Sequence, residues 1–177
     1  MKFRTVTLAS GSTFQVPQGI QRIDAKSTHG WQVRHLGTKF FSDGPSGDPQ
    51  LSLVNAVGEL LKRLHTGPIS VLLRQDVSPR KQTDLPVGIF GPIVRNRPGR
   101  AAVAELSVLL PRFGRQAQTK NIYIGSESTY SVEKYLAALE KGQTMRAEAT
   151  EQYERDAARA KRQAVQALRS HLRLLTS

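Results

Sequence analysis

The sequence predicts an α+β protein made of two small units, each a three-stranded antiparallel sheet packed on one α-helix, followed by a basic C-terminal helix. Three observations support this class. Short runs of alternating apolar and polar residues are separated by Gly, Ser and Asp, an amphipathic helix follows three such runs, and the whole order occurs twice. A chain of 177 residues is long enough to form two small cores of this kind.

Residues 1–18, "MKFRTVTLASGSTFQVPQ", precede the first unit and are predicted to form an N-terminal strand or arm. They carry two early cations but lack the continuous apolar core of a signal peptide. No stretch elsewhere reaches the roughly 20 apolar residues that a membrane span needs. We therefore expect a soluble, cytoplasmic protein without a membrane partner.

The first unit is predicted over residues 19–67. Its strands are expected in "GIQRID", "WQVRHL" and "KFFSD", and a loop rich in Gly, Pro and Ser follows them. The segment "PQLSLVNAVGELLKRL" then predicts an amphipathic helix that ends at Gly67 and Pro68. Its apolar stripe consists of Leu53, Val54, Val57, Leu60, Leu61 and Leu64.

The two faces of this first sheet are assigned from the alternation of its residues. A sheet packed on one helix has one apolar face and one wet face, so we expect Trp31, Val33 and Phe40 to point at the helix. The side chains expected on the wet face are Gln32, Arg34, Lys39 and Phe41. Such a face can hold phosphates and reach base edges, although a merely solvated face also carries Lys and Arg.

Residues 68–85 are predicted to connect the two units. The apolar run "ISVLLRQD" at 69–76 is expected to add a strand, and the polar, basic stretch "SPRKQTD" at 78–84 is expected to be a linker or loop.

The second unit is predicted over residues 86–146, with strands in "GIFGPIVRN", "AAVAELSVLLPRF" and "TKNIYIGS" and a helix from Tyr130 onward. Its order matches the first unit as a degenerate internal repeat, in which Gly88-Ile89 corresponds to Gly19-Ile20. Residues 147–177 contain no Pro and are rich in Ala, Glu, Gln and Arg, so they extend this helix or add a basic one. The cations of that segment form a solvated face or, in the last two turns, a contact surface.

The net charge, and the absence of residues for disulfides, catalysis or metal binding, limit the classes of function that the sequence allows. The 26 Lys and Arg residues outnumber the 14 Asp and Glu residues, and the net charge of +12 favours binding to a polyanion, nucleic acid before an anionic membrane. The chain has no cysteine, which excludes disulfides, thiolate catalysis and Cys-ligated zinc. The four histidines lack metal-ligand spacing, and neither a phosphate-binding loop nor a nucleophile with its base is recognisable. The sequence thus predicts no enzyme, cofactor or metal.

The order of "GWQVRH", "KFFSD" and an amphipathic helix resembles the plant apetala-type or ethylene-response-factor-type DNA-binding domain and its bacterial and phage relatives. The segments "GRAAVAELSV" and "KNIYIGSESTYSVEKYLAALEK" are similar to the same family, so the resemblance covers about residues 19–65 and 86–146. It implies a sheet that lies in the major groove of DNA. The family's closely spaced arginines of the first strand are missing from "GIQRID".

Carried over by position, the resemblance implies a set of DNA-contacting residues on the strands and turns of both units. In the first unit they are Arg22, Lys26, Gln32, Arg34, Lys39 and Phe41. In the second unit they are Arg95, Arg97, Arg100, Ser107, Lys120 and Tyr123.

The sequence as a whole predicts non-enzymatic binding of double-stranded DNA by a nucleoid-associated transcriptional regulator or a protein that organises chromosomal or phage DNA. Binding of RNA or the ribosome remains an alternative because the charge allows it equally. A protein-interaction adaptor that uses the C-terminal helix is the alternative from another class, and the arm of a recombinase is a third. The sequence leaves the oligomeric state open.

Overall fold

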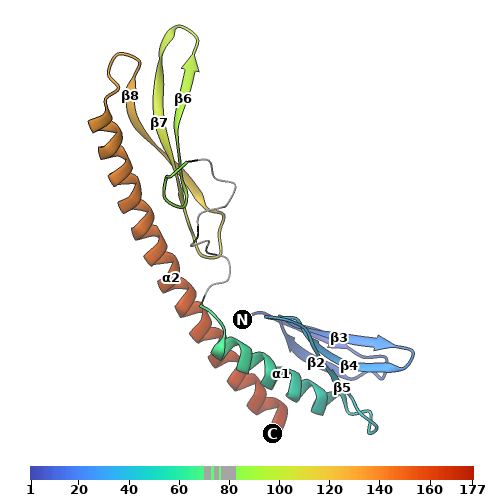
Figure 1. Ribbon diagram of the computed structural model, residues 1–177. Helices are drawn as coiled ribbons and strands as arrows, with labels where there is room; N and C mark the ends of the chain where they lie inside the picture. Colours follow the sequence, from blue (N-terminus) through green and yellow to red (C-terminus); the bar gives the residue numbers. More distant parts are fainter. Residues whose placement is uncertain (70–72, 74–75, 77–82) are drawn as a thin grey trace. The chain divides into compact units, whose positions relative to one another are not determined.

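The computed structural model describes residues 1–69, 73, 76 and 83–177. It confirms the α+β class and shows small antiparallel sheets combined with two helices in this described part (Figure 1). The chain divides into unit 1, residues 1–69 with 158–177, and unit 2, residues 70–157. The strand expected at 69–76 and the linker expected at 78–84 lie largely outside the described residues.

Unit 1 opens with a hairpin rather than the single strand or arm expected over residues 1–18. Strands β1 (Phe3–Thr7) and β2 (Thr13–Pro17) pair antiparallel. The chain reverses at Gly11, whose φ of 86° suits glycine. Phe14 of β2 packs edge-on against Trp31, with ring centroids 5.8 Å apart, and so joins the hairpin to the core of the unit.

The predicted three-stranded sheet of unit 1 is present. It consists of β3 (Ile20–Ala25), β4 (Thr28–Val33) and β5 (Lys39–Ser42), with β4 in the centre. Trp31 and Val33 are fully buried against α1 (Pro49–Thr66), as their alternation predicts. The side chain of Asp48 caps α1 by accepting hydrogen bonds from the backbone N–H groups of Gln50 and Leu51 at 2.8 and 3.1 Å.

The basic C-terminal segment is not a separate helix. One continuous helix, α2 (Val132–Thr176), contains both the helix expected in the second unit and the one expected at 147–177. No Pro or Gly follows Gly142 within it, so nothing interrupts its backbone hydrogen bonds. Its last part belongs to unit 1, where Leu168 is fully buried in the core and Leu172 packs against that core.

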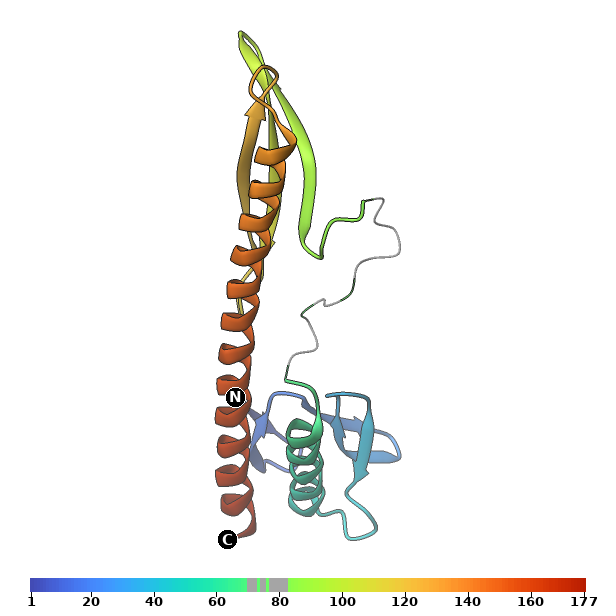
Figure 2. The same cartoon turned by 60° about the vertical axis from the view of Figure 1, so that its left-hand side comes forward.

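Helix α1 runs antiparallel to this last part of α2, as Figure 2 shows. The start of α1 lies at the end of α2, where the Gln50 side chain donates to the Leu175 carbonyl at 2.9 Å. The opposite end of α1 is tied to α2 by Lys161, whose Nζ donates to the Gly67 carbonyl at 2.7 Å. The core of unit 1 is therefore closed by residues from both ends of the chain.

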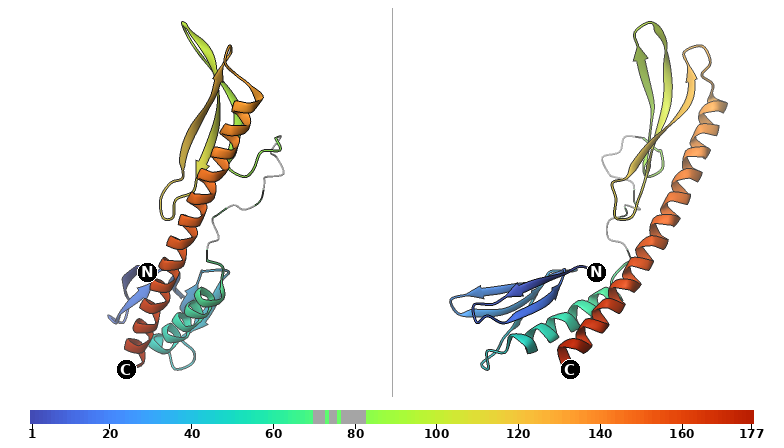
Figure 3. Two further views of the ribbon diagram at one scale, coloured as in Figure 1. Left: turned by 90° about the vertical axis from the view of Figure 1, so that its left-hand side faces the viewer. Right: turned by 180° about the vertical axis from the view of Figure 1, so that it is seen from behind.

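Unit 2 contains the second predicted sheet, formed by β6 (Ile89–Arg97), β7 (Arg100–Leu110) and β8 (Gln118–Ser126). The first part of α2 covers one face of this sheet (Figure 3). The core consists of Leu85, Ile89, Leu106, Val108, Ile122, Ile124 and Ala138. Helix and sheet approach closely at Gly142, because a Cβ there would lie 3.1 Å from a Val108 methyl group.

Two leucines of α1 provide a matched test of this packing. Leu53 is fully buried and Leu51 is 57% exposed. We expect Leu53→Ala to lower the free energy of unfolding of unit 1 by about 2 to 5 kcal/mol, because it leaves a cavity in the core. Leu51→Ala should change it by less than about 0.5 kcal/mol. Urea unfolding followed by the fluorescence of Trp31, the single tryptophan, reports on unit 1 alone. Equal effects of the two changes would contradict the assigned face of α1.

Candidate nucleic-acid interface

The face of the β3–β4–β5 sheet that points away from α1 carries few charges. The register aligns Gln21 with Gln32 and Gln32 with Phe40, so two amides and an aromatic ring form a row across the three strands. The Phe40 ring lies across Gly30, where a Cβ would come within 2.7 Å of Phe40 Cζ. This row can offer hydrogen bonds and a ring to a ligand, but it holds no cation of its own.

The expected orientation of strand β5 is wrong by one residue. Phe41 lies opposite Trp31 and packs against the core, whereas Phe40 points outward and is 37% exposed. Lys39 lies opposite the buried Val33, and its Nζ is 3.3 Å from Glu59 Oε2 on α1. Side chains in a strand alternate between the two faces, so a register shifted by one residue moves Lys39 and Phe41 off the outer face together.

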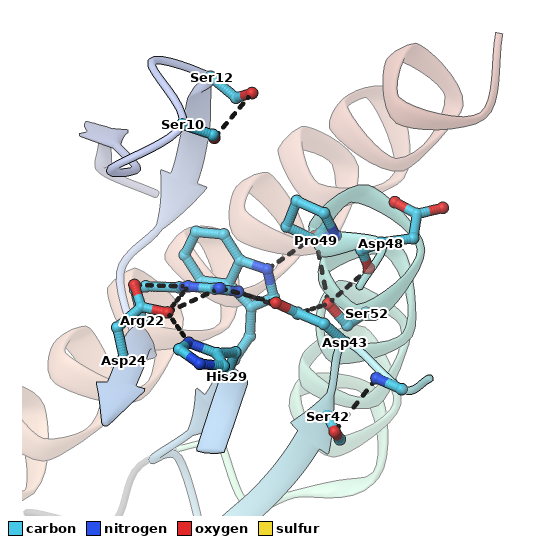
Figure 4. A network of polar contacts seen from close by, with 12 residues as sticks. Ser10, Ser12, Arg22, Asp24, His29, Ser42, Asp43, Asp48, Pro49 and Ser52 are labelled. Atoms are coloured by element: carbon cyan, nitrogen blue, oxygen red, sulfur yellow. Dashed lines mark hydrogen bonds and ion pairs between the residues drawn. The ribbon is translucent and has the colours of Figure 1, made fainter. Parts of the chain in front are cut away.

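Arg22 does not face outward either. It lies opposite Trp31 on the helix side of the sheet, its side chain is 12% exposed, and its guanidinium carbon is 5.1 Å from the Trp31 ring centroid. Its Nη1 and Nη2 donate to the two carboxylate oxygens of Asp43 at 2.9 and 2.7 Å, and Nη2 also reaches Asp24 at 2.8 Å (Figure 4). This side chain is largely buried and bonded to two carboxylates, so it does not lie on the outer face where the resemblance implies a DNA contact.

Asp43 is the centre of the polar network in Figure 4. It also accepts a hydrogen bond from Ser52 Oγ of α1 at 2.5 Å. Next to it, Trp31 Nε1 donates to the Pro49 carbonyl at 2.8 Å. Burial alone would raise the pKa of Asp43, but the hydrogen bonds from Arg22 and Ser52 outweigh it and hold the pKa below its ordinary value. The network thus fixes the sheet to the first turn of α1.

Three further cations surround a pocket at the other end of β3. The pocket has a volume of about 440 Å³. It is lined by Lys2, Phe3, Arg4, Gln18, Gly19, Ile20, Gln21 and Arg34. We call it the Lys2–Arg34 pocket. Three of these residues are cations and none is an acid.

Hydrogen bonds hold two of the three cations at the Lys2–Arg34 pocket. Arg4 Nη2 donates to the Ile20 carbonyl at 3.1 Å, and Arg34 Nε donates to Gln32 Oε1 at 2.5 Å. Within the described ranges, no carboxylate lies within 4.0 Å of the charged nitrogens of Lys2, Arg4 or Arg34. Arg34 therefore joins the pocket to the outer row of glutamines, and no carboxylate in the described part of the chain neutralises the positive charge there.

Lys2, Arg4 and Gln21 were missing from the residues expected at the site. The alternation in "MKFRT" puts Lys2 and Arg4 on one side of a strand, which is a usable signal. The alternation does not show that the hairpin packs beside Gly19. This packing brings Lys2 and Arg4 next to Arg34. Lys26, which was expected at the site, is exposed in the turn between β3 and β4, at the end of β3 far from the pocket.

The residues expected in unit 2 are not gathered into one cationic surface. Ser107 and Tyr123 lie on the face away from α2, and Tyr123 is 57% exposed. Arg95 is paired with Glu105, with Nε 2.9 Å from Oε2. Lys120 lies opposite the buried Val108 and so belongs to the helix side. Exposed Arg100 pairs with Arg97 in the backbone register, and nothing is described of the Arg97 side chain.

Among the described residues, no group of three or more His, Asp or Glu side chains is arranged to hold a metal ion. Neither α1 nor the described α2 combines the length and hydrophobicity that crossing a bilayer requires. Comparison with family models, with curated proteins and with solved structures finds no match to this chain. The resemblance to the apetala-type domain therefore remains a prediction.

The structural role of Arg22 can be separated from a binding role. We expect Arg22→Ala to lower the free energy of unfolding of unit 1 by about 3 to 5 kcal/mol, because it leaves the Asp43 carboxylate buried without its partner. Lys26→Ala, which removes an exposed cation from the same sheet, should leave the stability nearly unchanged. Urea unfolding followed by Trp31 fluorescence measures both. A stable Arg22→Ala protein would show that the network is dispensable.

The same network predicts acid sensitivity of unit 1. The pKa values of Asp43 and Asp24 are lower in the folded protein than their ordinary values, so these carboxylates stabilise the fold above the unfolded pKa of about 3.9. That contribution is lost as the pH falls through the folded pKa values, and the free energy of unfolding should decline from about pH 5 downward. In Asp43→Asn the decline should be shallower. Urea unfolding across this pH range measures the free energy of unfolding. If it declined as steeply in Asp43→Asn as in the unaltered protein, Asp43 would not be a cause of the acid sensitivity.

Proposed function

We propose that this protein binds double-stranded DNA without catalysing a reaction, and that the Lys2–Arg34 pocket with the adjacent outer row of unit 1 is the contact surface. One observation supports this proposal above the others. Three cations surround a single concave site whose lining contains no acid, although several cations elsewhere are paired with carboxylates. A site with this charge is suited to phosphate groups.

The chemistry of the pocket matches the two parts of DNA recognition. Lys2 and Arg4 provide charges for the phosphate backbone, and their binding releases condensed counterions from the DNA. Arg34 can contact a phosphate or the acceptor edge of guanine through its planar guanidinium. Gln32 and Gln21 carry amides that can pair with adenine, and they lie beside Arg34 on the outer row.

The proposed surface differs from the one that the resemblance implies. Arg22 and Lys39 are engaged with carboxylates on the helix side of the sheet. The cations that reach the ligand come instead from β1 and the residue before it, and from the residue after β4. Unit 2 adds Tyr123 and Ser107 on an outer face whose Arg95 is already paired. The proposed role is that of a transcriptional regulator or a DNA-organising protein, in which unit 1 makes the main contact.

Removal of two pocket cations tests the proposal. In the full chain we expect Lys2→Ala with Arg34→Ala to weaken binding to a short duplex about tenfold and to reduce the slope of log affinity against log salt by about two. Fluorescence anisotropy of a labelled duplex at several salt concentrations measures both quantities. The control is Lys39→Ala, because this lysine faces Glu59 and not the pocket. A larger loss in the control than in the double variant would contradict the proposed surface.

The choice of DNA over RNA needs its own comparison. Labelled duplex DNA, duplex RNA and single-stranded RNA are titrated with the full chain at matched salt, and we expect duplex DNA to bind most tightly. Preference for either RNA would replace DNA in the proposal. A nucleic-acid affinity that does not depend on salt would contradict phosphate contacts altogether.

A further inference from the structure

Unit 1 has a second cationic hollow, between the last turn of α1 and the part of α2 that packs beside it. Its volume is about 520 Å³. It is lined by His65, Lys161, Arg162, Val165, Gln166 and Arg169. We call it the α1–α2 notch. As in the Lys2–Arg34 pocket, the lining contains no acid.

The spacing along α2 explains how the notch collects its charges. Arg162, Gln166 and Arg169 recur at intervals of four and three residues, which places them on one side of a helix. Both arginines are exposed, and Val165 adds an apolar patch between them. Lys161 is half-buried because its Nζ bonds to the Gly67 carbonyl at the end of α1, which fixes one wall of the notch.

The arginines of the notch differ from Arg155 of the same helix in whether a carboxylate is paired with them. Arg155 is paired with Glu151, with Nη1 2.7 Å from Oε1. No carboxylate in the described part of the chain lies within 4.0 Å of the charged nitrogens of Arg162 or Arg169. Cations placed this close together repel each other, and a bound anion removes that repulsion. The notch thus holds two arginines that have no carboxylate partner among the described residues.

Both cationic sites lie beside the same end of α1. Gly19, which lines the Lys2–Arg34 pocket, lies next to Leu60, because a Cβ there would be 3.6 Å from a Leu60 methyl group. His65 of the notch is in the last turn of the same helix. Phe3 of the pocket also contacts α2, since its ring centroid is 4.9 Å from that of His171. The two sites therefore belong to one folded unit and are joined by packed side chains.

We propose that the α1–α2 notch is a second phosphate-binding site, which takes backbone phosphates of the nucleic acid that the Lys2–Arg34 pocket binds. The inference rests on the proposed function and extends it: the helices of unit 1 contact the backbone in addition to the sheet. Arg162 and Arg169 bind the phosphate oxygens, and His65 donates from the α1 side. Such contacts add affinity and salt dependence without adding sequence preference.

The test compares two double variants of the full chain that remove equal charge from the same helix. Arg162→Ala with Arg169→Ala should weaken binding to a short DNA duplex about tenfold and reduce the salt slope by about two. Arg155→Ala with Arg159→Ala removes two exposed arginines outside the notch and should reduce the slope much less. Trp31 fluorescence during urea unfolding verifies that unit 1 remains folded in both.

The outcomes separate this inference from the proposed function. If Lys2→Ala with Arg34→Ala weakens binding while Arg162→Ala with Arg169→Ala leaves affinity and slope unchanged, the notch is not a contact and the pocket stands. Equal losses in the two α2 variants would also overturn the notch, because net charge alone would then explain them. If the unaltered chain binds neither DNA nor RNA, the proposed function fails and the notch fails with it.

Discussion

The buried ion pair between Arg22 and Asp43 is the constraint on which the architecture of unit 1 depends. It joins β3 to the loop before α1, and Ser52 extends the connection into the helix. Asp43 is buried and has Arg22 as its charged partner, so movement of the loop would leave this carboxylate buried without a counter-charge. Trp31 lies beneath this pair and donates to Pro49, so the central side chain of the core is held by polar as well as apolar contacts.

This use of charge inside the unit determines which cations remain for a partner. Arg22, Lys39 and Arg63 are engaged with carboxylates on the side of the sheet that faces α1. Six cations without such a partner in the described part of the chain line the Lys2–Arg34 pocket and the α1–α2 notch, three at each site. A high net charge therefore says little about where a polyanion binds until the internal pairs have been assigned.

Much of the fold could be predicted from the sequence, because its periodicities are local. Trp31 and Val33 alternate with polar residues, and Leu53, Val57 and Leu60 recur at helical spacing, and all five are buried. The orientation of β5 could not be predicted, since the turn before it allows two registers that differ by one residue. The reversal of Phe40 and Phe41 follows from that single shift.

The candidate site was harder to predict because it depends on contacts between distant segments. From the sequence, Arg22 is predicted to be an exposed strand residue. Its burial depends on Asp43, which lies 21 positions away and beside it in the fold. Lys2 and Arg4 reach the pocket only because the first hairpin packs next to Gly19. The continuity of α2 was also undecided, because a helix without Pro can either extend its predecessor or start anew.

The division of α2 between the units affects the order in which the two cores can be completed while the chain is being synthesised. Unit 2 is inserted within unit 1, since residues 70–157 are synthesised between the two segments that build the first core. The N-terminal domain usually folds first during translation. In this chain the core of unit 1 lacks Leu168 until residues 158–177 have been made, whereas all residues of unit 2 are made before them.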